Sequence, residues 1–358
     1  MSQKDPRLEK LPPPKKKVET IAILKQLVAS TAALAELKGF AKTMPNQAIL
    51  INAIVIQEAK GSSEIENIIS SQDELYTALT VQKSIASPQT KEVINYRKAI
   101  FKGFEFLKKQ GFIRVNDVIE IQRILINNDA GIRSTPGTVL KNDKTGEVVY
   151  TPPQDKSEII ELLDNFIIHF NQRESDTSPL IQLAILHFQF ESIHPFYDGN
   201  GRTGRILNIL YLILNELLDI PILYLSSYII QNKNEYYQLL NKTNRTGEWE
   251  DWILYMLRAI EITAKSTIQK IEKIRLLLDD TIEIVKLQAA SIYRKELVEL
   301  LFEHPYCKIE YIKNSLKIGR KAASKYLNQL EEIGILSSHQ VGKEKVFINN
   351  SLVDLLKS

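Results

Sequence analysis

The chain has 358 residues, of which 44% are hydrophobic and 25% are charged, and its formal net charge is +3. This composition is ordinary for a soluble globular protein, the length allows two or three domains, and the small net charge is no argument for or against nucleic acid as a partner. The single cysteine, Cys307, excludes a framework of disulfides within the chain and fits a reducing compartment. Residues 1–7 lack the apolar segment of a secretory signal and no apolar run approaches about 18 residues, so we expect a cytoplasmic protein without a membrane segment.

The first 17 residues carry three consecutive prolines followed by three consecutive lysines. Because proline fixes the backbone and lacks a donor, we expect an extended arm on the surface, with contact to a membrane or a nucleic acid as the alternative. From Thr20 onward the spacing of apolar residues is helical, and Gly39 is expected to end this helix. Its apolar face is predicted to comprise Ile21, Ile23, Leu24, Leu27, Val28, Ala32, Leu34 and Leu37.

A second apolar stretch, residues 48–56, leads into a more polar segment at residues 58–67. Helical spacing predicts further helices at residues 89–110, 115–127, 156–172, 178–193, 204–218, 233–243 and 249–277. Residues 138–151 break this rhythm, because two β-prone runs flank a glycine-containing turn at residues 142–146 and predict a hairpin. A lone hairpin is marginally stable, so we expect it to lean on the helices as a flap over a site.

Residues 266–284 predict a long connecting helix, and the pattern changes after about residue 290. Helices near residues 297–302, 309–316 and 320–333, followed by a short hairpin at residues 335–348, form the outline of a winged helix-turn-helix. Basic side chains on the third helix and the hairpin make a candidate footprint for DNA phosphates, formed by Arg320, Lys321, Lys325, Lys343 and Lys345. Two acidic neighbours, Glu331 and Glu332, weaken that footprint, so protein docking and structural support are the alternatives.

The most informative segment is residues 194–205, which read His-Pro-Phe-Tyr-Asp-Gly-Asn-Gly-Arg-Thr-Gly-Arg. His194 has the side chain that can accept a proton from an attacking hydroxyl near neutral pH. Asp198 supplies a single hard carboxylate, which suits Mg²⁺ beside phosphates. The two glycines that flank Asn200 let the backbone approach a ligand closely, and the asparagine adds an amide donor.

The helix that follows would aim its free N–H groups and the positive end of its dipole at an anion. Arg202 and Arg205 lie three residues apart on its first turn, so both can fork onto phosphate oxygens. The alternatives are that the arginines merely pair with carboxylates and that Gly-Asn-Gly is a simple turn. However, the helix from Ile206 is apolar nearly all round and should be buried, so its charged start would open onto a site. The combination predicts phosphoryl or nucleotidyl transfer, whereas the other histidines are expected to be ordinary core or surface residues, namely His169, His187, His304 and His339.

Residues 194–205 resemble the signature of the Fic family, His-x-Phe-x-(Asp/Glu)-Gly-Asn-Gly-Arg-x-x-Arg, with no departure at any fixed position. The resemblance extends to most of the chain, since residues 11–69 are similar to the helical segment that precedes many Fic cores and the predicted hairpin resembles the Fic flap. It implies a mainly α fold in four parts: an N-terminal helical segment (1–85), a Fic core with its flap (86–265), a connecting helix (266–289) and a winged helix-turn-helix domain (290–358).

Members of this family transfer AMP from ATP to a Tyr, Thr or Ser hydroxyl of a protein and release pyrophosphate. The resemblance therefore implies ATP as substrate, Mg²⁺ as cofactor, and a target protein, the chain itself included, as partner. It implies that His194 deprotonates the hydroxyl, that Phe196 anchors the loop and that Asp198 binds Mg²⁺. The residues implied to bind ATP are Gly199, Asn200, Gly201, Arg202, Thr203, Gly204 and Arg205, with Tyr236, Tyr237 and Asn244 around the adenine. Helix packing is the alternative role for the two tyrosines.

A second motif, Ser-Ser-Glu-Ile-Glu-Asn at residues 62–67, resembles the family's inhibitory pattern (Ser/Thr)-x-x-x-Glu-(Gly/Asn), with Ser62, Glu66 and Asn67 at its fixed positions. A Glu66 carboxylate paired with Arg205 would lie in the ATP site, occupy the guanidinium meant for the γ-phosphate, repel that phosphate and leave the α-phosphate misplaced. The resemblance thus implies an autoinhibited adenylyltransferase and permits a homodimer that helps to hold Glu66.

Three alternatives stay open. The core could use another nucleotide donor or remove AMP, or the protein could be a DNA-binding regulator whose core senses a nucleotide. The flap could also bind a target segment by strand pairing, which carries little sequence information.

Overall fold

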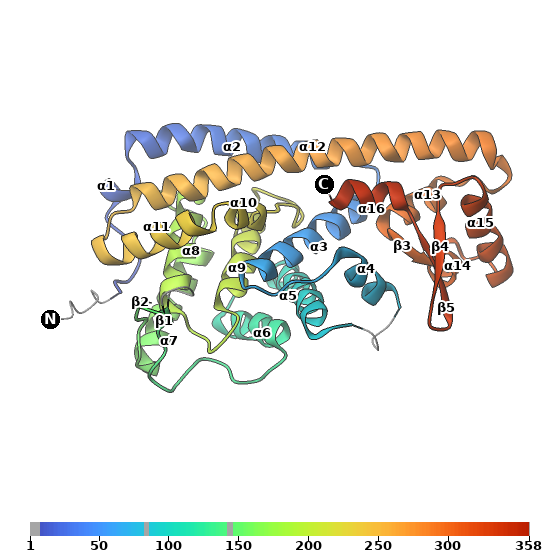
Figure 1. Cartoon of the computed structure of the whole chain (residues 1–358). Coiled ribbons are helices and arrows are strands. Elements are labelled where there is room, and N and C mark those ends of the chain that lie inside the picture. Colours follow the sequence, from blue (N-terminus) through green and yellow to red (C-terminus); the bar gives the residue numbers. More distant parts are fainter. Residues whose placement is uncertain (1–7, 82–85, 142–145, 358) are drawn as a thin grey trace.

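The computed structural model describes residues 8–81, 86–141 and 146–357. The chain is mainly helical, as predicted (Figure 1). Two long helices, α2 (Ile21–Ala41) and α12 (Glu250–Gln288), lie side by side along one edge of the molecule and run in the same direction. The central helices pack against the first half of α12, and the C-terminal elements lie at its other end.

Five helices form the core around the 194–205 segment: α5 (Pro88–Gln110), α6 (Val115–Ile126), α7 (Lys156–Asn171), α8 (Pro179–Ile193) and α9 (Asn200–Leu214). The first four confirm the predicted ranges to within one residue at either end. Helix α9 begins at Asn200, four residues before its predicted start, because Gly199 adopts a left-handed φ of 80° and its carbonyl already accepts the N–H of Thr203 at 2.9 Å. The glycine thus starts the helix within the motif instead of after it.

Helices α8 and α9 lie at the centre of this core. Every residue of α8 from Leu180 to Ile193 is buried, so the helix is covered on all sides. Most of α9 is buried as well, as its apolar composition predicted. The segment that joins the two helices is therefore held between two rigid elements, which fixes the residues it carries.

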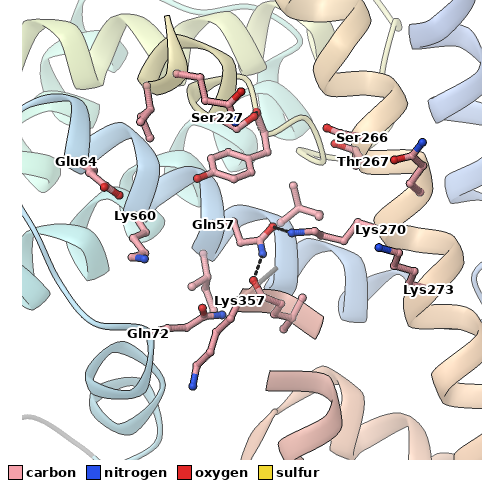
Figure 2. Close-up of a pocket in the computed structure, with 17 residues that line it drawn as sticks. Gln57, Lys60, Glu64, Gln72, Ser227, Ser266, Thr267, Lys270, Lys273 and Lys357 are labelled. Carbon is pink, nitrogen blue, oxygen red and sulfur yellow. Dashed lines mark hydrogen bonds between the residues drawn. The ribbon is translucent and has the colours of Figure 1, made fainter. Parts of the chain in front are cut away.

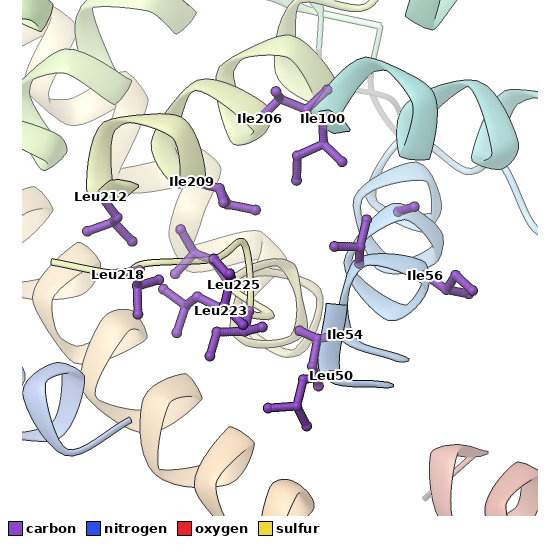
Figure 3. Close-up of a cluster of buried hydrophobic side chains, with 14 of the residues drawn as sticks. Leu50, Ile54, Ile56, Ile100, Ile206, Ile209, Leu212, Leu218, Leu223 and Leu225 are labelled. Carbon is purple, nitrogen blue, oxygen red and sulfur yellow. The ribbon is translucent and has the colours of Figure 1, made fainter. Parts of the chain in front are cut away.

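Helix α3 (Gln47–Ile65) extends the predicted apolar stretch into the inhibitory pattern and ends one residue before Glu66. Its buried residues Leu50 and Ile54 belong to a cluster with side chains of α9 and of residues 218–225 (Figure 3). Burial of a leucine or isoleucine side chain contributes about 1.5–3 kcal/mol. Packing of this kind sets the position of α3 and brings its C-terminal end to the start of α9.

Helix α2 differs from the prediction in two respects. Gly39 lies inside the helix, which continues to Ala41 because Ala41 is buried and Phe40 packs against the core. Part of the predicted apolar face is also wrong, since Ile21, Leu24 and Val28 are exposed at 75%, 45% and 71%. The helix is apolar on two sides, and only the side toward α12 and α8 is covered.

The N-terminal arm is only partly extended. Residues Lys15–Val18 form a short helix, α1, in which the prolines precede the first turn and so do not interrupt it. The arm is docked on the core, because the backbone N–H of Leu11 donates to Asn165 Oδ1 at 2.7 Å and Leu11 is buried. Residues 1–7 lie outside the described part of the chain.

The predicted hairpin is present as two short antiparallel strands, β1 (Leu140–Lys141) and β2 (Val148–Tyr150). Leu140 pairs with Tyr150 and Lys141 with Val148, with an irregular register between them. Of its predicted turn at residues 142–146, residues 142–145 lie outside the described residues. The hairpin leans on the core as expected, since the Tyr150 hydroxyl donates to the carbonyl of Ser192 at 3.1 Å.

The three helices and the hairpin predicted after residue 290 are confirmed: α13 (Lys295–Glu303), α14 (Ile309–Leu316), α15 (Arg320–Glu332), β4 (Ser337–Val341) and β5 (Glu344–Ile348). The pattern missed strand β3 (Tyr306–Lys308), which pairs with β5 to give the order β3-β5-β4, and the final helix α16 (Asn350–Lys357). The two helices predicted at 249–277 and 266–284 are one continuous helix, α12.

The remaining elements are α4 (Gln72–Thr80), α10 (Ser226–Gln231), α11 (Lys233–Thr246) and the 3-10 turn Ala290–Ile292. Helix α11 confirms the helix predicted at 233–243 and runs three residues further. Helix α10 contacts α3 through a buried carboxylate: Glu58 Oε1 accepts the Ser226 hydroxyl at 2.6 Å, and Oε2 accepts the Ser226 N–H at 3.0 Å. Burial raises the pKa of Glu58 above its ordinary value.

Candidate active site

The turn between α8 and α9 carries the candidate base. His194 caps α8 in a left-handed conformation with φ 49° and ψ 58°. Phe196 is fully buried and packs against Phe190, with the ring centroids 6.4 Å apart. The side-chain amide of Asn200 closes the turn, because its Oδ1 accepts the N–H of Phe196 and its Nδ2 donates to the carbonyl of Phe196, each at 2.8 Å. The side chain of Asn200 therefore braces the loop, and its contribution to an anion site is its backbone N–H.

Arg133 fastens the same turn from the opposite side, and sequence reasoning missed it. Its guanidinium is fully buried and donates to the carbonyl of His194 at 2.7 Å, to that of Ile193 at 3.2 Å and to that of Pro153 just after the hairpin. Its own N–H donates to the carbonyl of Pro195 at 3.0 Å. All these partners are backbone atoms distant in sequence, so no residue spacing could have indicated the contact.

The surroundings of His194 keep its imidazole neutral. Burial lowers the pKa of His194 to about 4, and the positive charge of Arg133 adds to this effect. At neutral pH the ring is therefore unprotonated and able to accept a proton.

The start of α9 has the features that favour an anion. The first N–H groups of a helix have no acceptor within the helix, and its dipole places partial positive charge there. Gly201 leaves this space open, since a Cβ on it would lie 2.5 Å from Glu66 Oε1 and 3.0 Å from Arg205 Nη1. The Glu66 carboxylate thus lies at the start of α9, where the family resemblance implies a phosphate site.

The predicted contact between Glu66 and Arg205 is present in the structure. Arg205 Nη2 donates to Glu66 Oε1 at 2.7 Å and to the carbonyl of Ser62 at 2.9 Å, and its Nε donates to Ser62 Oγ at 2.7 Å. Burial alone would raise the pKa of Glu66, but the charge of Arg205 lowers it below its ordinary value. Burial alone would likewise lower the pKa of Arg205, but Glu66 raises it.

Two further features hold this end of α3. Lys233 Nζ donates to the carbonyl of Ile65 at 2.6 Å, and its charge also lowers the pKa of Glu66, as a smaller contribution than that of Arg205. Asn67 follows with a left-handed φ of 61°, a conformation that asparagine tolerates better than most residues. Asn67 therefore turns the chain away from the site after Glu66.

Arg202 is almost fully buried and joins two carboxylates. Its Nη1 donates to Glu92 Oε2 at 2.6 Å and its Nη2 to Asp198 Oδ1 at 3.3 Å. The Asp198 side chain is 66% exposed, and the same oxygen accepts the N–H of Gly199 at 2.6 Å. Asp198 consequently presents a carboxylate to solvent at the start of α9.

Thr203 and Gly204 face the interior instead of the anion site. Thr203 is fully buried, and a Cβ on Gly204 would lie 2.5 Å from Glu191 Oε1 on α8. Gly204 therefore permits close packing of α9 on α8. Burial raises the pKa of Glu191 to about 7, which places a second titratable group near the site that sequence reasoning missed. The one signal in the sequence was a single carboxylate in a helix that is mostly apolar.

The three residues implied to surround adenine are not equivalent. Tyr236 is 1% exposed and bonds His187 Nε2 at 2.9 Å, and its ring packs against Trp252, so helix packing accounts for it. Tyr237 is 42% exposed. Asn244 lies on the same helix and accepts the Ser192 hydroxyl at 3.1 Å, which places it beside α8 just before His194.

The basic residues of the C-terminal elements are less available than the sequence indicated. Arg320, Lys321 and Lys325 are exposed on α15. Lys345, however, donates to Glu331 Oε2 at 2.8 Å, so one cation of the predicted footprint is paired with the acidic residue that weakened it.

Two general features bear on partners. Within the described residues, no helix is both long enough and apolar enough to span a bilayer. Among those same residues, no cluster of three His, Cys, Asp or Glu side chains could hold a metal ion by itself.

Comparisons with known proteins agree with this geometry. Three family models match the chain: Fic/DOC family N-terminal over residues 24–105, Fic/DOC family over residues 112–212, and the protein adenylyltransferase SoFic-like C-terminal domain over residues 277–352. The chain therefore belongs to the Fic/DOC family.

Among curated proteins, the chain is 26% identical over 178 residues to protein adenylyltransferase Fic of Nematostella vectensis and 29% identical over 175 residues to the probable protein adenylyltransferase aq_aa38 of Aquifex aeolicus. Each match covers 48% of this chain, and the matches span 38% and 52% of these two relatives, respectively.

Solved structures share the fold. A Fic family protein from Desulfovibrio desulfuricans superposes with a TM-score of 0.62 at 17% identity over 94% of this chain and 98% of that one. Fic-1 from C. elegans (residues 134–508) superposes with a TM-score of 0.52 at 21% identity over 69% of this chain and 72% of that one.

Proposed function

We propose that this protein is an autoinhibited adenylyltransferase that moves AMP from ATP to a Tyr, Thr or Ser hydroxyl of a protein. The observation that carries the proposal is the arrangement at the start of α9. The neutral side chain of His194 comes just before this helix, Arg202 and Arg205 are buried on its first turns, and Glu66 pairs with Arg205 there. Relatives named protein adenylyltransferase support the same reaction.

In the proposed reaction, His194 accepts the proton of the target hydroxyl as that oxygen attacks the α-phosphorus of ATP. The new bond joins the hydroxyl oxygen to the α-phosphorus, and the bond that breaks joins the α-phosphorus to the oxygen that bridges it to the β-phosphate. Pyrophosphate leaves with both electrons of that bond. Arg133 and Asn200 keep the histidine in place, because their hydrogen bonds fix the backbone on both sides of the turn.

The helix N-terminus and the arginines would stabilise the negative charge of the phosphates. Asp198 fits a role as the protein ligand of Mg²⁺, since its carboxylate is largely exposed beside this anion site. With a single carboxylate available, the phosphates themselves would supply other ligands. The ion would neutralise phosphate charge when bound.

Glu66 restrains this reaction in the proposal. Its carboxylate forms an ion pair with Arg205 at 2.7 Å and lies 2.5 Å from the position that a Cβ of Gly201 would take, so a phosphate cannot use the same guanidinium or the same space. The negative charges of Glu66 and of a phosphate brought this close would also repel each other. ATP could then bind only with its phosphates displaced from the attacking hydroxyl.

A transfer assay tests the reaction itself. The protein with Glu66→Gly is incubated with Mg²⁺, lysate and ATP labelled at either the α- or the γ-phosphate. Label on protein from α-labelled ATP alone, lost with the additional change His194→Ala, is the expected result. Label from γ-labelled ATP, or label that survives His194→Ala, would contradict the proposal.

The same assay separates the alternatives. Label from another α-labelled nucleoside triphosphate and none from ATP would favour a different donor. Loss of label from a pre-modified protein, on the other hand, would favour removal of AMP.

A further inference from the structure

A second charged site lies behind the inhibitory helix. A cavity of about 440 Å³ opens between α3, α10, α12 and α16 (Figure 2). The polar α3 residues that line it, Gln57, Lys60 and Glu64, alternate in sequence with Ser62 and Glu66, which contact Arg205. This volume falls within the range of about 300–1,000 Å³ that is typical of small-molecule sites. The cavity contains none of the 194–205 motif, so the chemistry already described does not account for it.

The walls of the cavity are strongly positive. Four lysines line it, Lys60 from α3, Lys270 and Lys273 from α12, and Lys357 from α16, against one lining carboxylate, that of Glu64. Lys357 pairs with Asp73 at 3.1 Å. For the other three lysines, no Asp or Glu within the described residues lies at ion-pair distance.

Lys270 is the best placed of these cations. It is partly buried, and its Nζ donates to Gln57 Oε1 at 3.3 Å, a long and neutral contact (Figure 2). Burial lowers the pKa of Lys270, and the nearby charge of Lys273 lowers it further. Two ammonium groups that repel each other would be stabilised by an anion between them.

The neutral polar groups of the lining are already engaged. The hydroxyls of Ser227 and Thr267 and the amide of Gln57 each donate to a backbone carbonyl, at 2.8, 2.7 and 2.5 Å, respectively. The donors left for an anion are therefore the lysine ammonium groups, which bind phosphate oxygens. Because these ammonium groups come from three separate helices, they favour a ligand with several phosphate groups over a single phosphate.

We propose that this cavity binds a small molecule that carries two or more phosphate groups, and that its occupancy acts on the last turn of α3. The first part is independent of the adenylyltransferase proposal. The second part rests on the proposed inhibitory role of Glu66.

The link to α3 is a direct contact. Tyr224 lines the cavity, and its ring packs on the backbone of α3 so closely that a Cβ on Gly61 would lie 2.6 Å from the Tyr224 hydroxyl oxygen. The next residue, Ser62, holds Arg205 through two hydrogen bonds. A ligand that draws in Lys60 or shifts Tyr224 therefore acts one residue away from the inhibitory contacts.

Binding is tested by calorimetry with inorganic tripolyphosphate, without Mg²⁺, on the full chain carrying His194→Ala, so that no transfer occurs. We expect the double change Lys270→Gln and Lys273→Gln to weaken binding by about tenfold or more, because it removes two cations from the cavity. The matched control, Lys265→Gln with Lys286→Gln, alters two exposed lysines of the same helix and should change affinity less than about twofold. Equal affinity in the two double variants would overturn the proposal, and so would equally tight binding of citrate.

A second measurement needs no cavity variant and so does not depend on its folding. Tripolyphosphate should slow acetylation of Lys270 relative to that of Lys265, as followed by mass spectrometry of the His194→Ala protein. In the same samples, amide exchange of peptides that span residues 57–66 should change. Absence of protection would overturn binding, whereas protection without a change in exchange would overturn the link to α3. Neither readout requires adenylyl transfer, so failure here is distinguishable from failure of the proposed function.

Discussion

The turn at residues 194–199 and the last turn of α3 meet at the start of α9, but their functional side chains are held in different ways. The turn is tied by a buried arginine and a buried asparagine to backbone atoms on both sides of His194. The Glu66 carboxylate, by contrast, is held by an ion pair between side chains, with Arg205. We therefore predict that the base keeps its position when the inhibitory carboxylate is released.

The largest effect should follow from breaking the support of the turn. Arg133→Met leaves the carbonyls of Ile193, His194 and Pro153 without their donor. We expect AMP transfer in the Glu66→Gly background to fall by about tenfold to a hundredfold, chiefly in kcat, because a misplaced base loses its alignment. Arg123→Met, which removes an exposed surface ion pair, is the control. An unchanged kcat for Arg133→Met would show that the turn does not need this support.

A second prediction concerns Glu191, a buried carboxylate of α8, and the dependence of folding stability on pH. Burial raises the pKa of Glu191 from an ordinary value of 4.5 to about 7 in the folded protein. The stability that the protonated form contributes is therefore complete below about pH 4.5 and is lost as the pH rises through 7. Glu191→Gln should therefore become more stable than the parent between pH 5 and 8, by up to about 3 kcal/mol. Denaturant unfolding of both proteins across this range measures the gap. A gap that does not grow with pH would contradict a raised pKa.

A smaller effect is expected at the end of α3. Ser62→Ala removes the hydroxyl that accepts Arg205 Nε but leaves the Glu66 contact, so transfer should rise only a few-fold, about 1 kcal/mol of weakened restraint. The neighbouring Ser63 provides a matched control, because it is equally buried and its hydroxyl makes no hydrogen bond within the described residues. Ser63→Ala should leave the rate unchanged. Equal rates in both variants would show that the hydroxyl of Ser62 does not support the restraint.

The smallest effect should come from Lys233→Gln, which weakens the hold on the carbonyl of Ile65 and removes a charge near Glu66. We expect a rise in transfer of about twofold, since a single partly exposed contact contributes about 1 kcal/mol or less. Arg245→Gln on the same helix is exposed and serves as control. A fall in transfer with Lys233→Gln would indicate that Lys233 acts on the substrate instead.

Much of this architecture could be predicted from the sequence. Helical spacing located α5, α6 and α7 because each has one clear apolar face, and it located α8 because that helix is apolar on most sides. The 194–205 motif predicted that an anion binds at the start of the next helix, although that helix begins four residues before its predicted start. Helix α2 misled the same reasoning because it is apolar on two sides, and periodicity cannot say which side the fold covers. Strand β3 has three residues and carries too little pattern to be recognised.

The residues of the candidate site could likewise be predicted only in part. The pairing of Glu66 with Arg205 could be predicted because two short motifs carried it. The role of Arg133 could not, because its partners are backbone carbonyls that any residue supplies. Asn200 was assigned to phosphate, yet its side chain braces the turn, and Tyr236 is buried where a ligand would have been expected. Motifs identify the residues of a site, but packing decides which atoms remain available to a ligand.

The restraint by Glu66 is the central claim, and the initial rate of AMP transfer in purified Glu66→Gly tests it most directly. The parent protein and Glu105→Gly, an exposed change within α5, provide the comparison. Loss of the 2.7 Å contact frees Arg205 and the space beside Gly201, so the Glu66→Gly rate should exceed the parent rate by at least about tenfold, while Glu105→Gly stays near the parent. A Glu66→Gly rate equal to that of the parent, in a protein that still binds ATP, would contradict the account.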